Sequence, residues 1–271
     1  MTLVIKASGD KELFSEEKLA SSIRRAGIPE DLQKTVANHV RGKLYDGIKT
    51  SEIYNHIVEF LERSEYPYAK TRYSLKQAIM TLGPSGYPFE DYLAKVFTAE
   101  GYQTQVRQIL QGTCVTHEID VVLEKQGTRA IVEAKYHNTP GIKTTIHVSL
   151  YTKARFDDVK EKNNIAQAWL VSNTSVTVDA ISYAQCVGMK IMSWNYPNEN
   201  SLRELIEKHR LFPITALTTV SLQHKQQLLN NHVVLCKQIC ENESLLDSLS
   251  LPEEQKKQIH KEAAFVCQSS S

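Results

Sequence analysis

Two carboxylates and a lysine stand at spacings that suit phosphodiester hydrolysis. Asp120 lies in one apolar, β-branched run, and Glu133 and Lys135 lie two residues apart in the next. Carboxylate oxygens suit Mg²⁺ or Mn²⁺, which can acidify a water molecule and polarise a phosphate oxygen. A lysine can orient the attacking water or stabilise negative charge as a compact cation. The set predicts metal-dependent cleavage, with Asp120 and Glu133 as metal ligands.

A β-hairpin would bring these three residues together. Lys125-Gln126-Gly127 is a short glycine-containing connection between the two runs, typical of hairpins. Strand alternation places Glu133 and Lys135 on one face of the second strand. In the first run the same alternation puts Asp120 opposite the strongly apolar face. That apolar face consists of Ile119, Val121 and Leu123.

A fourth candidate, Glu90, comes from the preceding helix. Apolar residues recur at helical intervals from Tyr87 to Glu100, and a strand is expected from Tyr102 to Ile109. Glu90 lies in the first turn of the helix, where its carboxylate could hydrogen-bond a metal-bound water. Glu-x-Lys alone is a weak pattern whose usual meaning is an exposed salt bridge, so the specificity comes from the whole arrangement.

The order of helix, strand, hairpin and apolar-apolar-Glu133-Ala134-Lys135 resembles the PD-(D/E)xK nucleases, and most closely their Mrr-like branch. Gly86-Tyr87-Pro88-Phe89-Glu90 is similar to that branch's helix start, while Ile119 replaces the proline common before the first acid. The resemblance implies that Glu90, Asp120, Glu133 and Lys135 form the catalytic site. It also implies a mixed sheet flanked by helices. The further expected elements are strands at 167–173 and 189–194 and helices at 178–186 and 202–209.

Four further residues are candidate DNA contacts. They are His137, Lys143, Lys153 and Arg155. Basic residues gather between positions 135 and 162, but acidic residues dilute them, so a solvated helix face is an equal alternative to a phosphate-tracking surface.

Residues 1–83 read as a small helical domain that opens with a strand at Leu3–Ile5 and a turn at Gly9-Asp10. Ser15 precedes two glutamates, which predicts a capped helix, and further helices follow to the break at residues 83–86.

The order VIKASGDKELFSEEKLASSIRRAG, GIKTSEIYNHIVEFL, YPYAKTRYSL resembles the ATP-cone, a regulatory nucleotide-binding module. Ala7 departs from it, since a basic residue is common there. The resemblance implies an ATP or dATP site. Its residues would be Lys6, Glu12, Ser15, Lys18 and Thr50. A module kept only for assembly is the alternative.

The rest of the chain suggests a folded protein of several parts. Of 271 residues, 41% are hydrophobic and 23% charged, and the net charge of +1 neither favours nor excludes nucleic acid. Five scattered cysteines suggest neither a disulfide framework nor a zinc site. No apolar run predicts a signal peptide or a membrane span, so a cytoplasmic location without membrane contact is expected.

The predicted fold class is α/β, or α+β for the whole chain, in three parts. Residues 1–83 would be the nucleotide-binding domain, 86–210 the catalytic domain, and 211–271 a helical extension for docking or dimerisation, with Gln268–Ser271 disordered.

The leading interpretation is a Mg²⁺-dependent endonuclease that cleaves double-stranded DNA and is regulated by adenine nucleotide. The protein could also form a homo-oligomer, which the sequence does not decide. The alternative is a nucleotide-responsive DNA-binding protein that keeps the fold without catalysis. Loss of an acid or of the lysine would indicate it, and none is lost.

Overall fold

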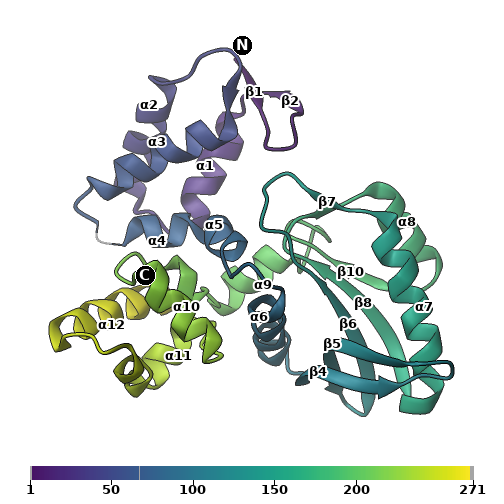
Figure 1. The fold of residues 1–271 in the computed structure, drawn as a ribbon. Coiled ribbons are helices and arrows are strands. Elements are labelled where there is room, and N and C mark those ends of the chain that lie inside the picture. Colours follow the sequence, from purple (N-terminus) through teal and green to yellow (C-terminus); the bar gives the residue numbers. More distant parts are fainter. Residues whose placement is uncertain (1, 67, 269–271) are drawn as a thin grey trace. The chain divides into compact units, whose positions relative to one another are not determined.

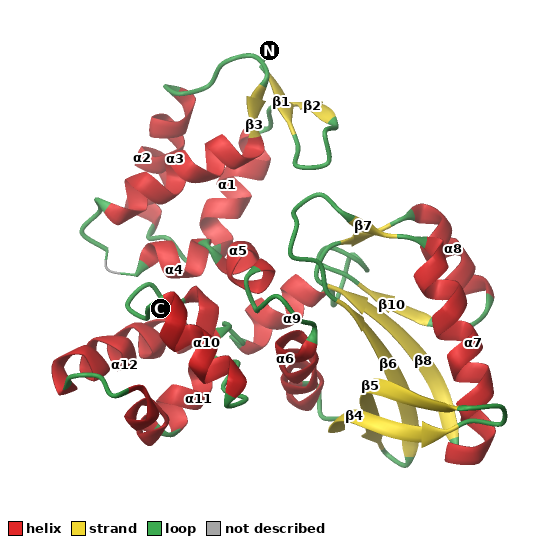
Figure 2. Cartoon of the chain, viewed as in Figure 1, coloured by secondary structure: helices red, strands yellow, loops and turns green. Residues whose placement is uncertain are grey.

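The computed structural model describes residues 2–66 and 68–268, and its mixed α/β content matches the predicted fold class (Figures 1 and 2). The chain packs as two compact units. One comprises residues 1–79, 212–225 and 236–271, and the other comprises residues 80–211 and 226–235. These units describe packing, so the division of the sequence into three parts stays a prediction.

The first unit begins with a small sheet of order β2-β1-β3. β1 (Leu3–Ile5) pairs antiparallel with β2 (Lys11–Leu13) and parallel with β3 (Ile48–Lys49). The helices of this part are α1 (Glu16–Arg25), α2 (Glu30–Arg41), α3 (Thr50–Glu62), α4 (Ala69–Tyr73) and α5 (Leu75–Met80). The predicted strand, turn and helices are therefore present.

Helix α1 begins where the capping pattern predicts. The Ser15 hydroxyl accepts a hydrogen bond from the Lys18 N–H, and Glu16 and Glu17 occupy the first turn. Leu19 and Ile23 of α1 are buried in a core shared with α2 and α3.

The C-terminal helices complete this unit. They are α10 (Leu222–Asn230, which runs into the second unit), α11 (Cys236–Glu241), α12 (Glu253–Cys267) and the 3₁₀ helices η1 (Ile214–Ala216) and η2 (Glu243–Leu249). Glu262 of α12 is fully buried and accepts hydrogen bonds from the backbone N–H groups of Thr218 (2.8 Å) and Thr219 (2.9 Å). The helical tail is confirmed. Of the four residues predicted to be disordered, Gln268 is instead the C-cap of α12, where its N–H donates to the Ala264 carbonyl, and residues 269–271 lie outside the described residues.

The second unit contains a five-stranded mixed sheet of order β10-β8-β6-β5-β4. β4, β5 and β6 form an antiparallel meander, and β8 lies parallel to β6 and β10. The strands are β4 (Gln103–Gln111), β5 (Thr116–Lys125), β6 (Thr128–Lys135), β8 (Ile165–Ser172) and β10 (Lys190–Met192). A separate pair joins β7 (Lys143–Thr144) and β9 (Ser175–Val176).

Helices cover both faces of this sheet (Figure 1). α6 (Tyr87–Ala99) and α9 (Leu202–His209) lie on one side, and α7 (Ile146–Asn163) and α8 (Val178–Cys186) on the other. The predicted helices at 178–186 and 202–209 are confirmed.

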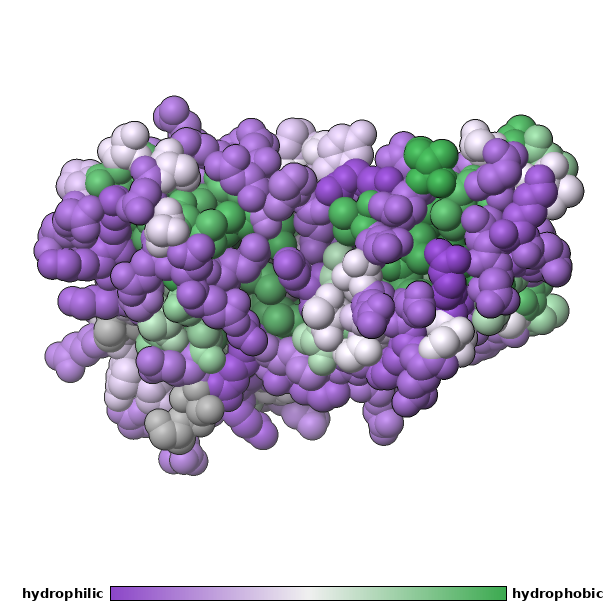
Figure 3. All heavy atoms as spheres, turned by 90° about the horizontal axis from the view of Figure 1, so that it is seen from below, coloured by the Kyte–Doolittle hydropathy of each residue, from purple (hydrophilic) through white to green (hydrophobic). Residues whose placement is uncertain are grey.

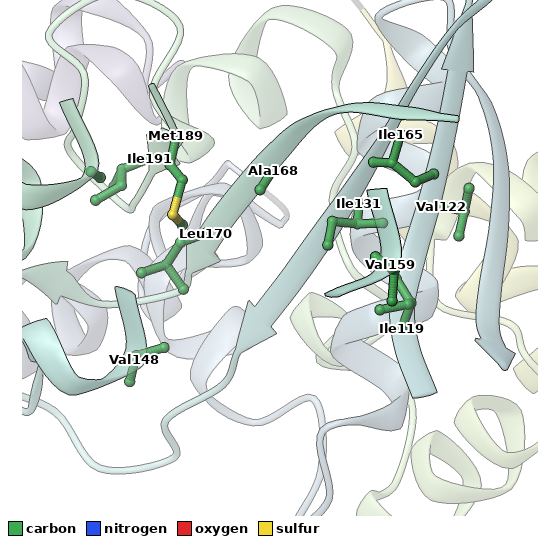
Figure 4. Close-up of a cluster of buried hydrophobic side chains, with 11 residues drawn as sticks. Ile119, Val122, Ile131, Val148, Val159, Ile165, Ala168, Leu170, Met189 and Ile191 are labelled. Carbon is green, nitrogen blue, oxygen red and sulfur yellow. The ribbon is translucent and has the colours of Figure 1, made fainter. Parts of the chain in front are cut away.

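Both faces of β5 are buried. The neighbouring residues Val121 and Val122 are 0% and 3% exposed, and Val122 belongs to one core cluster with Ile119 and Ile131 (Figure 4). This burial follows from the helices that cover the sheet on both faces.

The hairpin between β5 and β6 has the predicted turn. Gln126 and Gly127 have φ values of 52° and 74°, the left-handed pair that a two-residue type I′ turn needs. This turn sets the register that pairs Val121 with Val132.

Among the described residues, no helix is long and apolar enough to cross a membrane. On the face drawn in Figure 3, mostly hydrophilic side chains cover the surface.

Candidate active site

Asp120 and Glu133 lie side by side on neighbouring antiparallel strands. The pairing of Val121 with Val132 places the two acids opposite each other at the next step of the ladder. The Asp120 carboxylate accepts a hydrogen bond from the Ala134 N–H at 2.6 Å, which holds it across the strand gap. The hairpin therefore brings together the two predicted metal ligands.

Burial raises the pKa of Asp120 to about 7, and the neighbouring Glu133 and Glu90 carboxylates add to the rise. A buried carboxylate next to two others is costly to ionise unless a cation approaches. The surroundings of Asp120 thus favour a proton or a metal ion at this position.

Both oxygens of Glu133 are held by α7. The Tyr151 hydroxyl donates to Oε1 at 2.7 Å, and Arg155 Nη1 donates to Oε2 at 2.6 Å. Burial raises the pKa of the Tyr151 phenol, and the charge of Glu133 and the hydrogen bond to it add to the rise. The sequence reasoning missed Tyr151, and it gave Arg155 only as a DNA contact.

Glu90 lies in the first turn of α6 and is 8% exposed. Its Oε2 accepts a hydrogen bond from Arg107 Nη1 at 3.2 Å, and burial raises its pKa. Arg107 was also missed. A single arginine within the otherwise uncharged strand β4 was the available signal.

Lys135 ends β6 beside Ser172 of β8. The Lys135 ammonium forms no hydrogen bond or ion pair with any residue that the structure describes. Burial lowers the pKa of His137, and the charge of Lys135 lowers it further. With no partner among the described residues, this cation, two positions from Glu133 on β6, is available to a phosphate.

His137 lies in a hydrogen-bonded loop. The Asn173 side chain accepts from the His137 N–H at 2.8 Å and donates to the His137 carbonyl at 2.7 Å, and the imidazole Nε2 pairs with Thr144 Oγ1 at 3.0 Å. Asn173, fully buried, is a structural residue that the sequence reasoning missed. A DNA contact by His137 stays a prediction.

Lys153 is on α7, where it pairs with Asp157, and Lys143 is exposed on β7. In the described part of the chain, no hydrogen bond or ion pair joins either lysine to the carboxylates of Asp120 or Glu133. Their role as DNA contacts also remains a prediction.

The donor set fits one hard divalent cation. No group of three or more His, Cys, Asp or Glu side chains among the described residues is arranged as a metal site. Mg²⁺ needs no such cage, since it is commonly held by one or two carboxylates and completes its shell with water and substrate oxygens. Asp120 and Glu133 can provide those two carboxylates.

The predicted nucleotide residues also meet in space. Glu12 Oε2 binds both Lys6 Nζ at 2.7 Å and Lys18 Nζ at 2.9 Å, and hydrogen bonds from these two lysines lower the pKa of Glu12. Ser15 caps the same helix that carries Lys18.

Thr50 lies at the same end of the small sheet. β1 and β3 are parallel, with Ile5 paired to Lys49, so Lys6 and Thr50 follow directly at neighbouring strand ends. All five predicted residues therefore cluster around the ends of β1 and β3 and the start of α1.

Comparison with known proteins gives three domain matches. Residues 2–78 match the ATP cone domain, residues 83–196 match a restriction endonuclease domain, and residues 212–267 match the AF1548-like C-terminal domain. The predicted pairing of an ATP-cone with an Mrr-like domain is confirmed, and the tail is a domain of its own family.

One curated relative and one solved structure are similar to most of the chain. An uncharacterised protein from Archaeoglobus fulgidus is 35% identical over 175 residues, which cover 64% of this chain and 99% of the relative. The crystal structure of the protein of unknown function AF1548 is 33% identical with a TM-score of 0.60, covering 68% of this chain and 98% of that one.

A repair endonuclease from Pyrococcus abyssi is 18% identical with a TM-score of 0.32, over 40% of this chain and 46% of that one, which is too low to support an assignment. At 35% and 33% identity over 99% and 98% of the matched proteins, the chain belongs to the AF1548-like family, with an ATP cone domain ahead of its restriction endonuclease domain.

Proposed function

We propose that the chain is a Mg²⁺-dependent endonuclease of double-stranded DNA whose activity responds to ATP or dATP. One observation carries the nuclease part: Asp120 and Glu133 adjoin on β5 and β6, and Lys135, whose ammonium pairs with none of the described residues, follows Glu133 by two positions on β6. The restriction endonuclease domain match over residues 83–196 supports the same chemistry.

Each residue has a distinct task in this proposal. Asp120 and Glu133 would hold the cation, which when bound supplies an acidified water and neutralises phosphate charge. Lys135 would bind a phosphate oxygen and stabilise the charge that develops there. Glu90 would accept a hydrogen bond from water at the site and so orient it.

Helix α7 fixes the direction of the Glu133 carboxylate. Tyr151 and Arg155 each hold one of its oxygens, and Arg155 is only partly buried. Since a rigid ligand loses less freedom on binding, these contacts favour a site formed before the cation arrives.

Regulation would begin at the cluster of Lys6, Glu12 and Lys18. Two lysines and the capped start of α1 suit a triphosphate, because ammonium groups and helix N–H groups both attract phosphate oxygens. The sequence has no P-loop pattern, so binding without hydrolysis is expected.

Incubating the purified full chain with supercoiled plasmid tests the nuclease part. We expect nicked and linear product with Mg²⁺ or Mn²⁺, and none in chelator. Retention of plasmid in a gel-shift assay without product under any metal would instead indicate a non-catalytic DNA-binding protein. Absence of both cleavage and retention would refute the nuclease proposal.

Calorimetry with ATP and with dATP tests the nucleotide part separately. Binding heat together with a changed cleavage rate supports regulation. Heat without any change of rate or of light-scattering mass would limit the module to binding.

A further inference from the structure

Asp91, the neighbour of Glu90 on α6, joins two segments that are distant in the sequence. It is 9% exposed. Its Oδ1 accepts a hydrogen bond from Arg107 Nη2 at 2.7 Å, and its Oδ2 pairs with His232 Nδ1 at 2.8 Å. Because Arg107 also binds Glu90, a continuous chain of contacts leads from His232 to a carboxylate of the candidate site.

Arg107 has an unusual backbone for a strand residue. Its φ is 50°, a left-handed value that non-glycine residues rarely adopt within a sheet. The pairs Val106–Val121 and Gln108–Ile119 flank it, so Arg107 lies opposite Asp120 at the one step where the ladder is interrupted. A strained residue persists when its surroundings hold it, and strain of this kind is common at functional sites.

The guanidinium of Arg107 bridges two buried acids. It lies 3.2 Å from Glu90 Oε2 and 2.7 Å from Asp91 Oδ1, and its side chain is 24% exposed. Two adjacent carboxylates in one helical turn repel each other unless a cation bridges them. Arg107 therefore sets where Glu90 points.

His232 also has left-handed backbone, with φ of 59°. It follows α10 in a Schellman arrangement, in which the His232 N–H donates to the Leu229 carbonyl at 3.0 Å and the Val233 N–H to the Leu228 carbonyl at 2.9 Å. This position ordinarily favours glycine or asparagine. A histidine adopts this left-handed backbone less readily than glycine or asparagine does. Its imidazole contacts Asp91.

The loop that carries His232 is firmly anchored. Val233, Val234 and Leu235 are at most 4% exposed, and residues 226–235 pack with the unit that contains the sheet. These residues belong to the segment that matches the AF1548-like C-terminal domain.

We propose that the C-terminal domain completes the nuclease site. His232 and Arg107 are positioning residues that hold Asp91 from its two sides and so direct the Glu90 carboxylate toward Asp120. The role rests on the proposed function, because Glu90 has a task only if the site binds a cation and cleaves DNA.

Two substitutions at His232 separate the hydrogen bond from the backbone. His232→Gly removes the imidazole and tolerates the left-handed backbone, whereas His232→Asn tolerates the same backbone and keeps a side-chain N–H near the place of Nδ1. For each full-length variant, kcat, the Mg²⁺ concentration at half-maximal rate, and DNA affinity in Ca²⁺ would be measured. Mg²⁺ affinity would also be measured by calorimetry without DNA.

We expect His232→Gly to raise the half-maximal Mg²⁺ concentration about fivefold, with DNA affinity unchanged, and His232→Asn to stay within about twofold of the parent chain. The effect is modest because the His232 side chain is 69% exposed. Arg107→Gln should act in the same direction by about 10-fold to 100-fold, since it removes the bridge between the two acids.

His209→Ala is the matched control. His209 pairs with Glu100 at the far end of α6, so its loss removes a histidine–carboxylate pair from the same helix without reaching Glu90. It should leave the Mg²⁺ dependence unchanged.

The outcomes separate the two proposals. If the parent chain neither cleaves nor binds Mg²⁺, the proposed function fails and the positioning role fails with it. If the parent chain cleaves and His232→Gly matches it, or if the glycine and asparagine variants are equally impaired with the same loss of melting temperature, only the positioning role is refuted.

Discussion

At the scale of single residues, Asp120 shows how function and stability oppose each other in this protein. A carboxylate buried beside Glu133 has its pKa raised to about 7, so near neutral pH the metal-free fold carries an unfavourable charge. Binding sites commonly retain such a cost because the ligand removes it.

Replacing Asp120 or Lys135 with alanine should severely reduce cleavage. Lys135→Ala is expected to lower kcat by about 10²-fold to 10³-fold, since its charge would act on the transition state, while DNA binding in Ca²⁺ largely survives. Plasmid cleavage and filter binding on the same preparations check this. Undiminished cleavage by both variants would contradict the site assignment.

Glu90→Ala should be milder. A carboxylate that orients water rather than holding the metal is expected to change the rate by about 10-fold to 100-fold at limiting Mg²⁺ and by less at high Mg²⁺. A titration of rate against Mg²⁺ measures the difference. A loss that stays constant at every Mg²⁺ concentration would instead indicate a direct metal ligand.

Asp120→Asn should stabilise the metal-free protein above neutral pH. A raised pKa means that the folded state binds this proton more tightly than the unfolded state, so stability falls as pH rises from the ordinary value of 3.8 to about 7. The variant lacks that fall, and its advantage should reach on the order of 4 kcal/mol at pH 8 and vanish near pH 3.

Thermal unfolding in chelator across this pH range is the measurement. A parent chain and an Asp120→Asn variant whose melting temperatures differ equally at pH 3 and pH 8 would show that the carboxyl titrates normally.

At the scale of elements, the turn from β4 to β5 is fixed onto α7. The Asp158 carboxylate accepts hydrogen bonds from the Cys114 N–H at 2.7 Å and the Val115 N–H at 3.3 Å, and it pairs with His117. Since α7 also holds Glu133, this contact links the meander to the helix that orients a proposed metal ligand.

Gly112 lies where the turn approaches the Asp158 side chain of α7 most closely. A Cβ atom there would lie 2.5 Å from the Val115 carbonyl oxygen and still closer to the Asp158 carboxylate. Gly112→Ala should therefore destabilise the protein by about 1–3 kcal/mol.

Denaturant unfolding checks this against Gly42→Ala. The nearest atom to a Cβ at Gly42 would be the His39 carbonyl oxygen at 3.7 Å, an ordinary contact distance. Gly42→Ala should therefore change the free energy of unfolding by no more than about 0.5 kcal/mol. Equal stability of the two variants would mean that the turn can move away from α7.

At the scale of the whole molecule, the chain combines an ATP cone domain with a restriction endonuclease domain, and the proposed regulation requires that nucleotide bind two states of the protein unequally. The compact units show which segments pack together, and the C-terminal domain contributes residues to both.

ATP or dATP should change the cleavage rate or the light-scattering mass without being hydrolysed. Lys6→Ala and Lys18→Ala should each weaken nucleotide binding roughly tenfold, because each removes a charged partner of phosphate. Lys11→Ala is the control, since Lys11 is exposed on the neighbouring strand and has no side-chain partner among the described residues.

Calorimetry and light scattering on the same samples decide this prediction. Absence of binding heat at millimolar ATP and dATP, or equal binding by all three variants, would leave the ATP cone domain as a module for assembly alone.

Much of this protein was predictable from the sequence because its signals are local. Ser15 caps α1, the Gln126-Gly127 turn sets the hairpin register, and that register alone places Asp120 opposite Glu133. Turn type and strand alternation depend on residues that are near one another in the chain, so the local sequence pattern predicts both.

Other features were decided by the tertiary structure. Arg155 reaches Glu133 only because α7 packs on that face of the sheet, and Arg107 and His232 meet Asp91 only because two left-handed backbones are held by distant contacts. No hydrophobic or strand periodicity relates side chains that lie far apart in the sequence. Backbone strain at one residue is also maintained by packing elsewhere in the fold, so no local sequence pattern predicts these contacts.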